Sequence, residues 1–473
     1  MCLVVGVLPK ELSDVFEKHK LSLTGTFIAT KIGDEWSMQD IDGNARYTLK
    51  QEKEYLAVFE HGVLLFEVNE GDQIAFGKFF FDGDTGVNSN VLKREVAHLE
   101  DTLYTQDKLS GAIQNLYNTG IFELGIRPER RIPTDIEEQP SNPVVNDVLI
   151  RLQKRKPRAI GASVGYGSSD GPRGTIALSH YNLFKRNVRF RLRGRQGTLG
   201  YLYDTTLTEP WFIGRISGSL QFLGRKLEED DGVRALQGSF SLSRKLSRAH
   251  RLNLEYSYRD LKDTSVAFSE TTVSSLRALW RQDTRAPSLN PTSGMLKEAT
   301  FEYAGGPLLG GESSFIKAVG DIRYHRKLNE WGLVLGTALR FGITTGLQTD
   351  RGAELISFER FWAGGSTTVR GYEERGLGPK DSTGKHRGNV QFIFNTELSF
   401  PIFNPIQGVL FFDTGNVWDT IENIEYEWLP STVGAGLRLN FGPLKLGVDY
   451  AAPLISIPDV PTNSFYFRIG STF

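Results

Sequence analysis

The chain has 473 residues and a formal net charge of −1, a balance that argues against a nucleic-acid-binding protein. Its single cysteine, Cys2, excludes an internal disulfide framework. No run of about 18 apolar residues occurs, so helical membrane spans are excluded. A transmembrane β-barrel fits the 50 glycines and the mean hydropathy of −0.28, because its strands alternate apolar and polar residues.

The first 68 residues are predicted to form a small β-rich module, with a short helix near residues 10–18 followed by hairpins. No motif in residues 1–68 points to a family. The segment from Met1 to Leu8 lacks a basic lead and a cleavage site, so it is a poor export signal. Because an outer-membrane barrel needs such a signal, we expect the sequence to begin downstream of the true start.

Residues 69–156 predict a small α+β domain. Its expected elements are a strand at 74–81, helices at 89–99 and from Thr105, a strand opening at Phe122 and a last strand at 144–152. In the second helix, apolar residues recur at the spacing of one buried face, namely at Leu109, Ile113, Leu116 and Tyr117.

Residues 157–473 alternate in the manner of sixteen antiparallel strands, and an even number of strands returns both ends of the chain to the same side. In the third strand, Val188, Phe190 and Leu192 face one way, whereas Arg189, Arg191 and Arg193 face the other. This pattern predicts lipid outside and a wet, charged lumen inside. The longest connection, about 343–388, is the sixth outer loop.

The sixth loop carries three short motifs within about twenty residues. They are Gly364-Gly365, then Val369-Arg370-Gly371-Tyr372, then Gly378-Pro379. Together they resemble the sixth-loop signature of the superfamily of outer-membrane barrels that insert or export other proteins, which includes BamA/TamA-like assembly factors and two-partner secretion transporters. The resemblance implies a mostly β protein with a 16-stranded transmembrane barrel.

Residues 69–156 resemble the polypeptide-transport-associated (POTRA) domain of the same superfamily. The resemblance rests on Glu70-Gly71, on Phe81-Asp82-Gly83 at the end of a strand, and on residues 118–122 at the end of a helix. It implies a periplasmic module that binds extended client chains by strand addition or hands them to the barrel. Any other small α+β domain is the alternative.

The Arg370 guanidinium stays charged, so we expect it to have an acidic partner when it is buried. Period-two counting points Asp413 and Glu397 into the lumen. The resemblance implies that the aspartate of the Phe411-x-Asp413-x-Gly415 strand meets the loop arginine, and Glu397 is placed to share it. The alternative is that Asp413 only ends a strand and caps a turn.

The first and last strands of the barrel are the predicted site of a lateral seam. The last strand places Phe465, Phe467 and Phe473 on the lipid face, and its aromatic end resembles the carboxy-terminal address of bacterial barrel proteins. Gly161, Gly165 and Gly167 give the first strand few side chains to hold the seam. We hypothesise that the two strands part transiently and that a client strand pairs with the freed edge; a loosely paired but closed seam is the alternative.

No catalytic residue, metal ligand or cofactor site is predicted. The segment Gly161-Ala-Ser163-Val-Gly165 matches the hydrolase nucleophile elbow in letters, but the elbow requires a strand, a turn and a helix, and this serine falls within an alternating strand. The histidines lack ligand spacing. The chain is therefore not expected to be an enzyme.

The predicted function is insertion or assembly of outer-membrane proteins in a Gram-negative-type bacterium, with the soluble domain in the periplasm. The second candidate is a two-partner secretion transporter, and a passive porin fits the sixth loop and the soluble domain less well. The expected partners are unfolded outer-membrane proteins or a secreted partner protein, the lipid bilayer and periplasmic accessory proteins, but no nucleic acid.

Overall fold

The computed structural model describes the backbone of five short strands between residues 27 and 65 and, with short gaps, residues 73–469. The gaps within the second range are 84, 124–126, 132–143, 168–170, 199, 228–232, 264–268, 288–289, 348–358, 382–383, 426, 428, 442–443 and 459. The chain divides into two compact units, one of residues 1–80, 96–111 and 128–150, and one of the remaining residues.

The amino-terminal strands form two small antiparallel sheets. Strands β1 (Phe27–Ile32), β2 (Glu35–Asp40) and β3 (Arg46–Thr48) make one, and β4 (Leu56–Phe59) and β5 (Gly62–Leu65) make the other. These hairpins agree with the predicted β-rich character of residues 1–68. The helix expected near residues 10–18 lies outside the described residues.

The next region has the order β6, α2, η1, α3, β7, β8, and its strands form a sheet in the order β6-β8-β7. The element bounds are β6 Ile74–Asp82, α2 Ser89–Val96, η1 Ala97–Leu99, α3 Gln106–Asn118, β7 Arg127–Arg131 and β8 Val144–Arg151. The strand expected to open at Phe122 begins instead at Arg127. Phe122 forms only an isolated bridge with Lys154, because residues 121–123 pair locally with the chain that follows β8.

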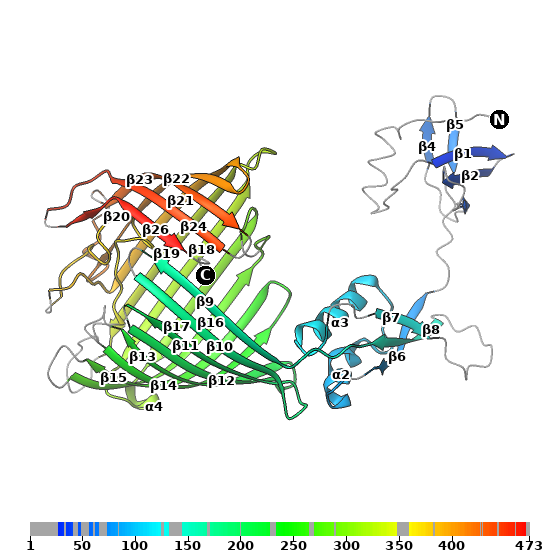
Figure 1. Cartoon of the computed structure of the whole chain (residues 1–473), viewed down its shortest axis with the longest axis horizontal. Helices are drawn as coiled ribbons and strands as arrows, with labels where there is room; N and C mark the ends of the chain where they lie inside the picture. The colour runs from blue at the N-terminus through cyan, green and yellow to red at the C-terminus, as the bar shows by residue number, and fades with distance from the viewer. Residues whose placement is uncertain are drawn as a thin grey trace. The chain divides into compact units, whose positions relative to one another are not determined.

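Sixteen strands close into an antiparallel barrel, which confirms the predicted strand number (Figure 1). In chain order they are β9 (Arg158–Gly167), β10 (Gly171–Leu183), β11 (Val188–Gly197), β12 (Gly200–Ile213), β13 (Ile216–Leu227), β14 (Val233–Lys245), β15 (His250–Asp263), β16 (Ser269–Asp283), β17 (Gly294–Ala304), β18 (Phe315–Lys327), β19 (Val334–Gly346), β21 (Val390–Phe403), β22 (Ile406–Trp418), β23 (Ser431–Phe441), β24 (Leu444–Pro453) and β26 (Phe465–Ile469). Two short elements, α4 (Gly306–Leu309) and β20 (Gly371–Tyr372), lie in connections, and β25 (Thr462–Asn463) precedes the last strand.

The two faces of the barrel wall differ as the alternation predicts. Leu192 of β11 is exposed on the outer face, whereas its neighbour Arg193 forms an ion pair with the fully buried Asp204 of β12 on the inner face. Ser163 lies in the middle of β9, so the letters of the nucleophile elbow form no elbow. Among the residues that the structure describes, no helix combines the length and apolar character needed to cross a membrane.

Candidate functional site

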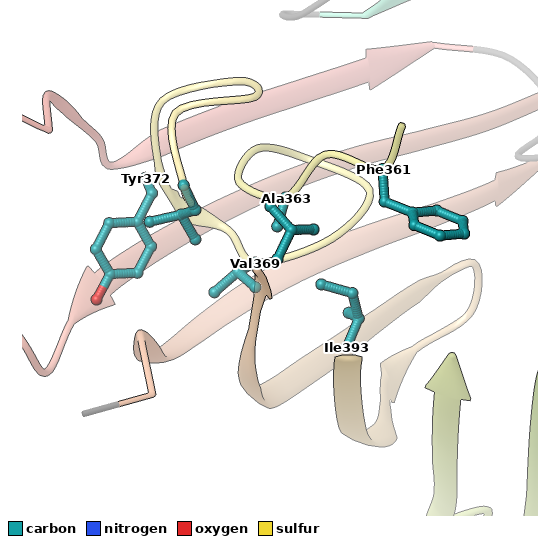
Figure 2. Close-up of a cluster of buried hydrophobic side chains, with 7 residues drawn as sticks. Phe361, Ala363, Val369, Tyr372 and Ile393 are labelled. Atoms are coloured by element: carbon teal, nitrogen blue, oxygen red, sulfur yellow. The ribbon is translucent and has the colours of Figure 1, made fainter. Parts of the chain in front are cut away.

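The sixth loop, between β19 and β21, is folded against the inner face of the barrel wall. Its two arms pair where it meets the wall, because the amide of Phe361 donates to the carbonyl of Gly388 at 2.7 Å and the amide of Gly388 donates back at 2.9 Å. The loop then builds its own apolar core, part of which is seen in Figure 2 beside Ile393 of β21. The buried members of this core are Phe361, Ala363, Val369, Tyr372, Leu377, Ile393 and Val417.

The small residues of this loop have a backbone reason, which is clearest at Gly371. Its φ is +94°, a value that L side chains rarely adopt, and a Cβ there would come within 2.9 Å of Thr432 on β23. Gly364 and Gly365 also have positive φ angles, of 99° and 95°. The glycines therefore let the loop backbone approach the wall closely and turn back on itself.

Arg370 is the charged centre of the site and is only 5% exposed. Its Nε and Nη2 donate to the two carboxylate oxygens of Asp413 on β22, at 2.6 and 2.9 Å. Its Nη1 donates to Glu397 on β21 at 2.8 Å and to Asp449 on β24 at 3.4 Å. The bidentate bond fixes the guanidinium plane as well as its position.

An aromatic ring, an amide and a second arginine surround Arg370 and its carboxylates. The guanidinium lies 3.5 Å from the ring centroid of Phe411, within the range of a cation–π contact. Asn395 donates to both Asp413 and the loop carbonyl of Thr368, and Arg438 of β23 donates twice to Asp449. Two arginines thus neutralise most of the charge of three carboxylates.

Arg370 belongs to a loop and lies outside the membrane-spanning strands. Burial alone would lower its pKa, but the hydrogen bonds and attraction of Asp413, with the charges of Glu397 and Asp449, raise the pKa above its ordinary value. The three carboxylates therefore favour the charged form of the guanidinium.

Tyr372 holds the last residue of the Val369–Tyr372 motif in place. It is fully buried, and its hydroxyl donates to the carbonyl of Ile455 at 2.7 Å. Its backbone and that of Gly371 form β20, which pairs with β25 in the register Gly371↔Asn463 and Tyr372↔Thr462. The Val369–Tyr372 motif therefore contacts both the wall and the segment that leads into the last strand.

The barrel closes between β9 and β26 over a short ladder. Within the described part of β26, which ends at Ile469, the register contains two pairs, Arg468↔Gly167 and Ile469↔Tyr166. Phe465 and Phe467 are exposed, whereas Tyr466 between them is buried. Gly161, Gly165 and Gly167 all lie on β9, whereas Phe473 lies outside the described residues.

Comparison with known proteins identifies the family. A family model described as "Omp85 superfamily domain" matches residues 182–473, which is more than half of the chain. The chain belongs to the Omp85 superfamily.

Individual Omp85 relatives and solved structures agree with this assignment. The chain is 24% identical to the outer membrane protein assembly factor BamA of Nitratidesulfovibrio vulgaris over 88% of this chain and 53% of that protein. It therefore spans about half the length of this relative. The fold resembles that of BamA from Haemophilus ducreyi lacking POTRA domains 1–3, with a TM-score of 0.69, 18% identity, and coverage of 99% and 94% of the two chains. CdiB from Acinetobacter baumannii gives a TM-score of 0.56 at 17% identity, over 84% and 73%.

The structure of this Omp85 barrel adds a second buried charge cluster that the sequence analysis missed. Arg259 of β15 donates to Glu302 of β17 at 2.7 Å and to Glu359 of the sixth loop at 2.5 Å. Lys317 of β18 donates to the carboxylate and the carbonyl of Glu359. Period-two counting on β15, β17 and β18 was the signal that these charges face inward.

The second cluster lies beside an apolar group on the same wall, formed by Ala235, Leu261, Val273, Ala304 and Phe315. Arg259, Glu302 and Glu359 are each at most 5% exposed. Loop six is therefore held at two places on the wall, by Glu359 at β15 and β18 and by Arg370 at β21, β22 and β24.

Proposed function

We propose that this protein inserts or assembles other proteins in an outer membrane, as a factor of the BamA/TamA type. The observation that carries the proposal is that loop six is bonded to the inner wall of a barrel whose first and last strands meet at a seam, where the described residues form two register pairs. Such a barrel keeps its lumen occupied, and the junction of its first and last strands is the place where its wall can part. Insertion then needs no catalytic group or cofactor, because pairing and folding of the client supply the driving force.

The seam between β9 and β26 is the proposed exit to the lipid. Gly161, Gly165 and Gly167 weaken the packing of β9 against its neighbour, since glycine contributes no side chain. Once the seam parts, β9 presents unpaired backbone groups that a client strand can match. Phe465 and Phe467 meet lipid on the other side of the seam.

Residues 69–156 are proposed to be a periplasmic POTRA domain between an amino-terminal module, 1–68, and the barrel, 157–473. In the sheet order β6-β8-β7, the outer side of β6 is taken, because Phe76 and Ile74 exchange backbone hydrogen bonds with residues 101–104. The outer side of β7 is the candidate edge for strand addition by an extended client or an accessory protein.

A second candidate function is export of a secreted partner protein through the lumen. The fold similarity to CdiB, a two-partner transporter, supports it. In that mechanism loop six leaves the lumen and the seam stays closed. The two candidates therefore place the moving part at different positions in the same barrel.

The proposal is tested by locking the seam. Tyr166→Cys and Ile469→Cys, combined with Cys2→Ser, place thiols on the register pair that joins β9 to β26. The purified protein is reconstituted in lipid vesicles, and the folding rate of a urea-unfolded outer-membrane barrel is measured with and without a thiol cross-linker. Cross-linking is expected to abolish the acceleration of client folding.

The matched control carries Leu220→Cys and Phe240→Cys, a register pair between β13 and β14. Cross-linking this pair is expected to leave client folding unchanged. Full activity of the seam-locked protein refutes a lateral exit, and the secretion candidate then becomes the one to pursue.

A further inference from the structure

The last strand contacts loop six through a tyrosine side chain. Tyr466 of β26 is 3% exposed, and its ring packs with Val409, Phe411 and Ala451 on the inner wall. Its hydroxyl accepts a hydrogen bond from the amide of Gly371 at 2.9 Å and donates one to the carbonyl of Tyr372 at 2.9 Å. One side chain thus bridges two consecutive backbone groups of the loop motif.

The segment before the last strand repeats this connection through its backbone. Strand β25 pairs with β20, and the amide of Glu373 donates to the carbonyl of Pro461 at 2.9 Å. On its other side, the described part of β26 pairs with β24 at five positions. The last strand is therefore bound both to β24 and to loop six.

We propose that Tyr466 is a positioning residue that makes the last strand and loop six move as one body. The inference rests on the proposed parting of the seam, and it assigns which side moves. When the seam parts, β26 stays with loop six and β24, and β9 leaves. The edge available to a client strand is then that of β9, while the hydrogen bonds between Arg370 and the wall carboxylates remain formed.

The two hydrogen bonds to loop six require the hydroxyl of Tyr466, whereas the packing of its ring does not. Gly371 is buried, so without the Tyr466 hydroxyl its amide loses its partner in a place that water does not easily reach. Phenylalanine would keep the ring contacts with Val409 and Phe411 and remove only the two hydrogen bonds. A residue that serves only as wall packing would tolerate that change.

The first experiment compares Tyr466→Phe with the native protein by hydrogen exchange in lipid vesicles, without a client. Two peptides are followed, one covering residues 370–373 and one covering 461–466. Loss of the bridge is expected to speed exchange in both peptides together by about tenfold or more, because a buried donor loses its partner. The control is Tyr450→Phe on β24, a tyrosine that is half exposed on the outer face.

An unchanged exchange rate in Tyr466→Phe, or a change confined to one of the two peptides, overturns the inference. Barrel formation is checked by the heat-sensitive gel mobility typical of folded barrels. Since no client is present, this result is independent of the insertion assay. Failure of insertion with the expected exchange would contradict the proposed function and leave the coupling intact.

A second measurement needs no change at Tyr466. Cross-linking the Tyr166→Cys and Ile469→Cys pair is expected to slow exchange in residues 158–167 of β9 and to leave residues 370–373 unchanged. Equal slowing in both segments would mean that loop six leaves the last strand whenever the seam parts, and would also overturn the inference.

Discussion

The carboxylates around Arg370 differ in burial, and this difference ranks the effects of substituting them. Asp413 is fully buried and bidentate, whereas the side chain of Glu397 is 38% exposed. Asp413→Asn leaves the guanidinium partly unpaired in a dry site and is expected to lower the free energy of unfolding by about 3–5 kcal/mol. Glu397→Gln is expected to cost about 1 kcal/mol or less, because water screens that pair.

The measurement is urea unfolding of each variant from lipid vesicles. An Arg370→Ala, Asp413→Ala double-mutant cycle then isolates the coupling of the pair from the cost of each truncation. Equal losses for Asp413→Asn and Glu397→Gln would contradict the assignment of Asp413 as the principal partner.

The cation–π contact of Arg370 depends on Gly434 of β23, which lies opposite Phe411 of β22. The Phe411 ring lies over Gly434, and a Cβ at position 434 would come within 2.2 Å of the ring and 2.4 Å of the Tyr450 carbonyl. Gly434→Ala should therefore displace Phe411 and destabilise the barrel by about 1–3 kcal/mol. Gly174→Ala on β10 is the control, because nothing lies within 4 Å of its Cβ position.

The readout for this pair is hydrogen exchange of residues 369–373, measured beside urea unfolding. Gly434→Ala is expected to speed exchange in the loop motif, since Phe411 supports the Arg370 guanidinium. If both alanine variants show the exchange rate and the stability of the native protein, the packing of Phe411 does not support the contact of Arg370 with the wall.

Loop six contacts the barrel wall through two separate groups of charged residues, one around Glu359 and one around Arg370. Glu359→Gln weakens the buried bonds to Arg259 and Lys317 without touching Arg370. We expect exchange in residues 359–363 to rise about tenfold or more, while residues 369–373 stay protected, because the two groups share no side chain. Glu270→Gln is the control, since its pair with Lys262 is exposed and contributes little.

Simultaneous loss of protection in both segments after Glu359→Gln would mean that the loop opens as a single unit. That outcome would contradict the prediction that the Glu359 and Arg370 contacts break independently. The two sets of contacts would then form one cooperative unit.

The elements of the barrel could be predicted from the sequence because alternation along each strand is a local property. Arg370 and Asp413 could be brought together because each carries a recognisable motif. Asp449 could not, since its contact depends on the register of β24 against β23, which no local pattern specifies. Glu359 was missed for a similar reason, because its partners lie on strands about 40 to 100 residues away in sequence.

In the whole molecule, the two proposed routes for a client depend on different parts of the barrel. Loop six is bonded to the inner wall through Arg370 and Glu359, and the ladder between β9 and β26 closes the wall. A route through the lumen requires the loop to leave, whereas a route into the lipid requires the ladder to break. The two routes can therefore be separated by changing one of these parts at a time.

Replacing residues 359–388 by a short flexible linker is expected to raise the ion conductance of single barrels in planar bilayers severalfold, because it removes the apolar core and both groups of charged contacts from the lumen. Cross-linking Tyr166→Cys to Ile469→Cys is expected to leave the conductance at the value measured for the native protein, since loop six stays in place. An insertion factor should lose client folding in the cross-linked protein despite this unchanged conductance. A secretion pore should instead keep export of its partner with the seam locked, so a locked barrel that still exports would reverse the order of the two candidate functions.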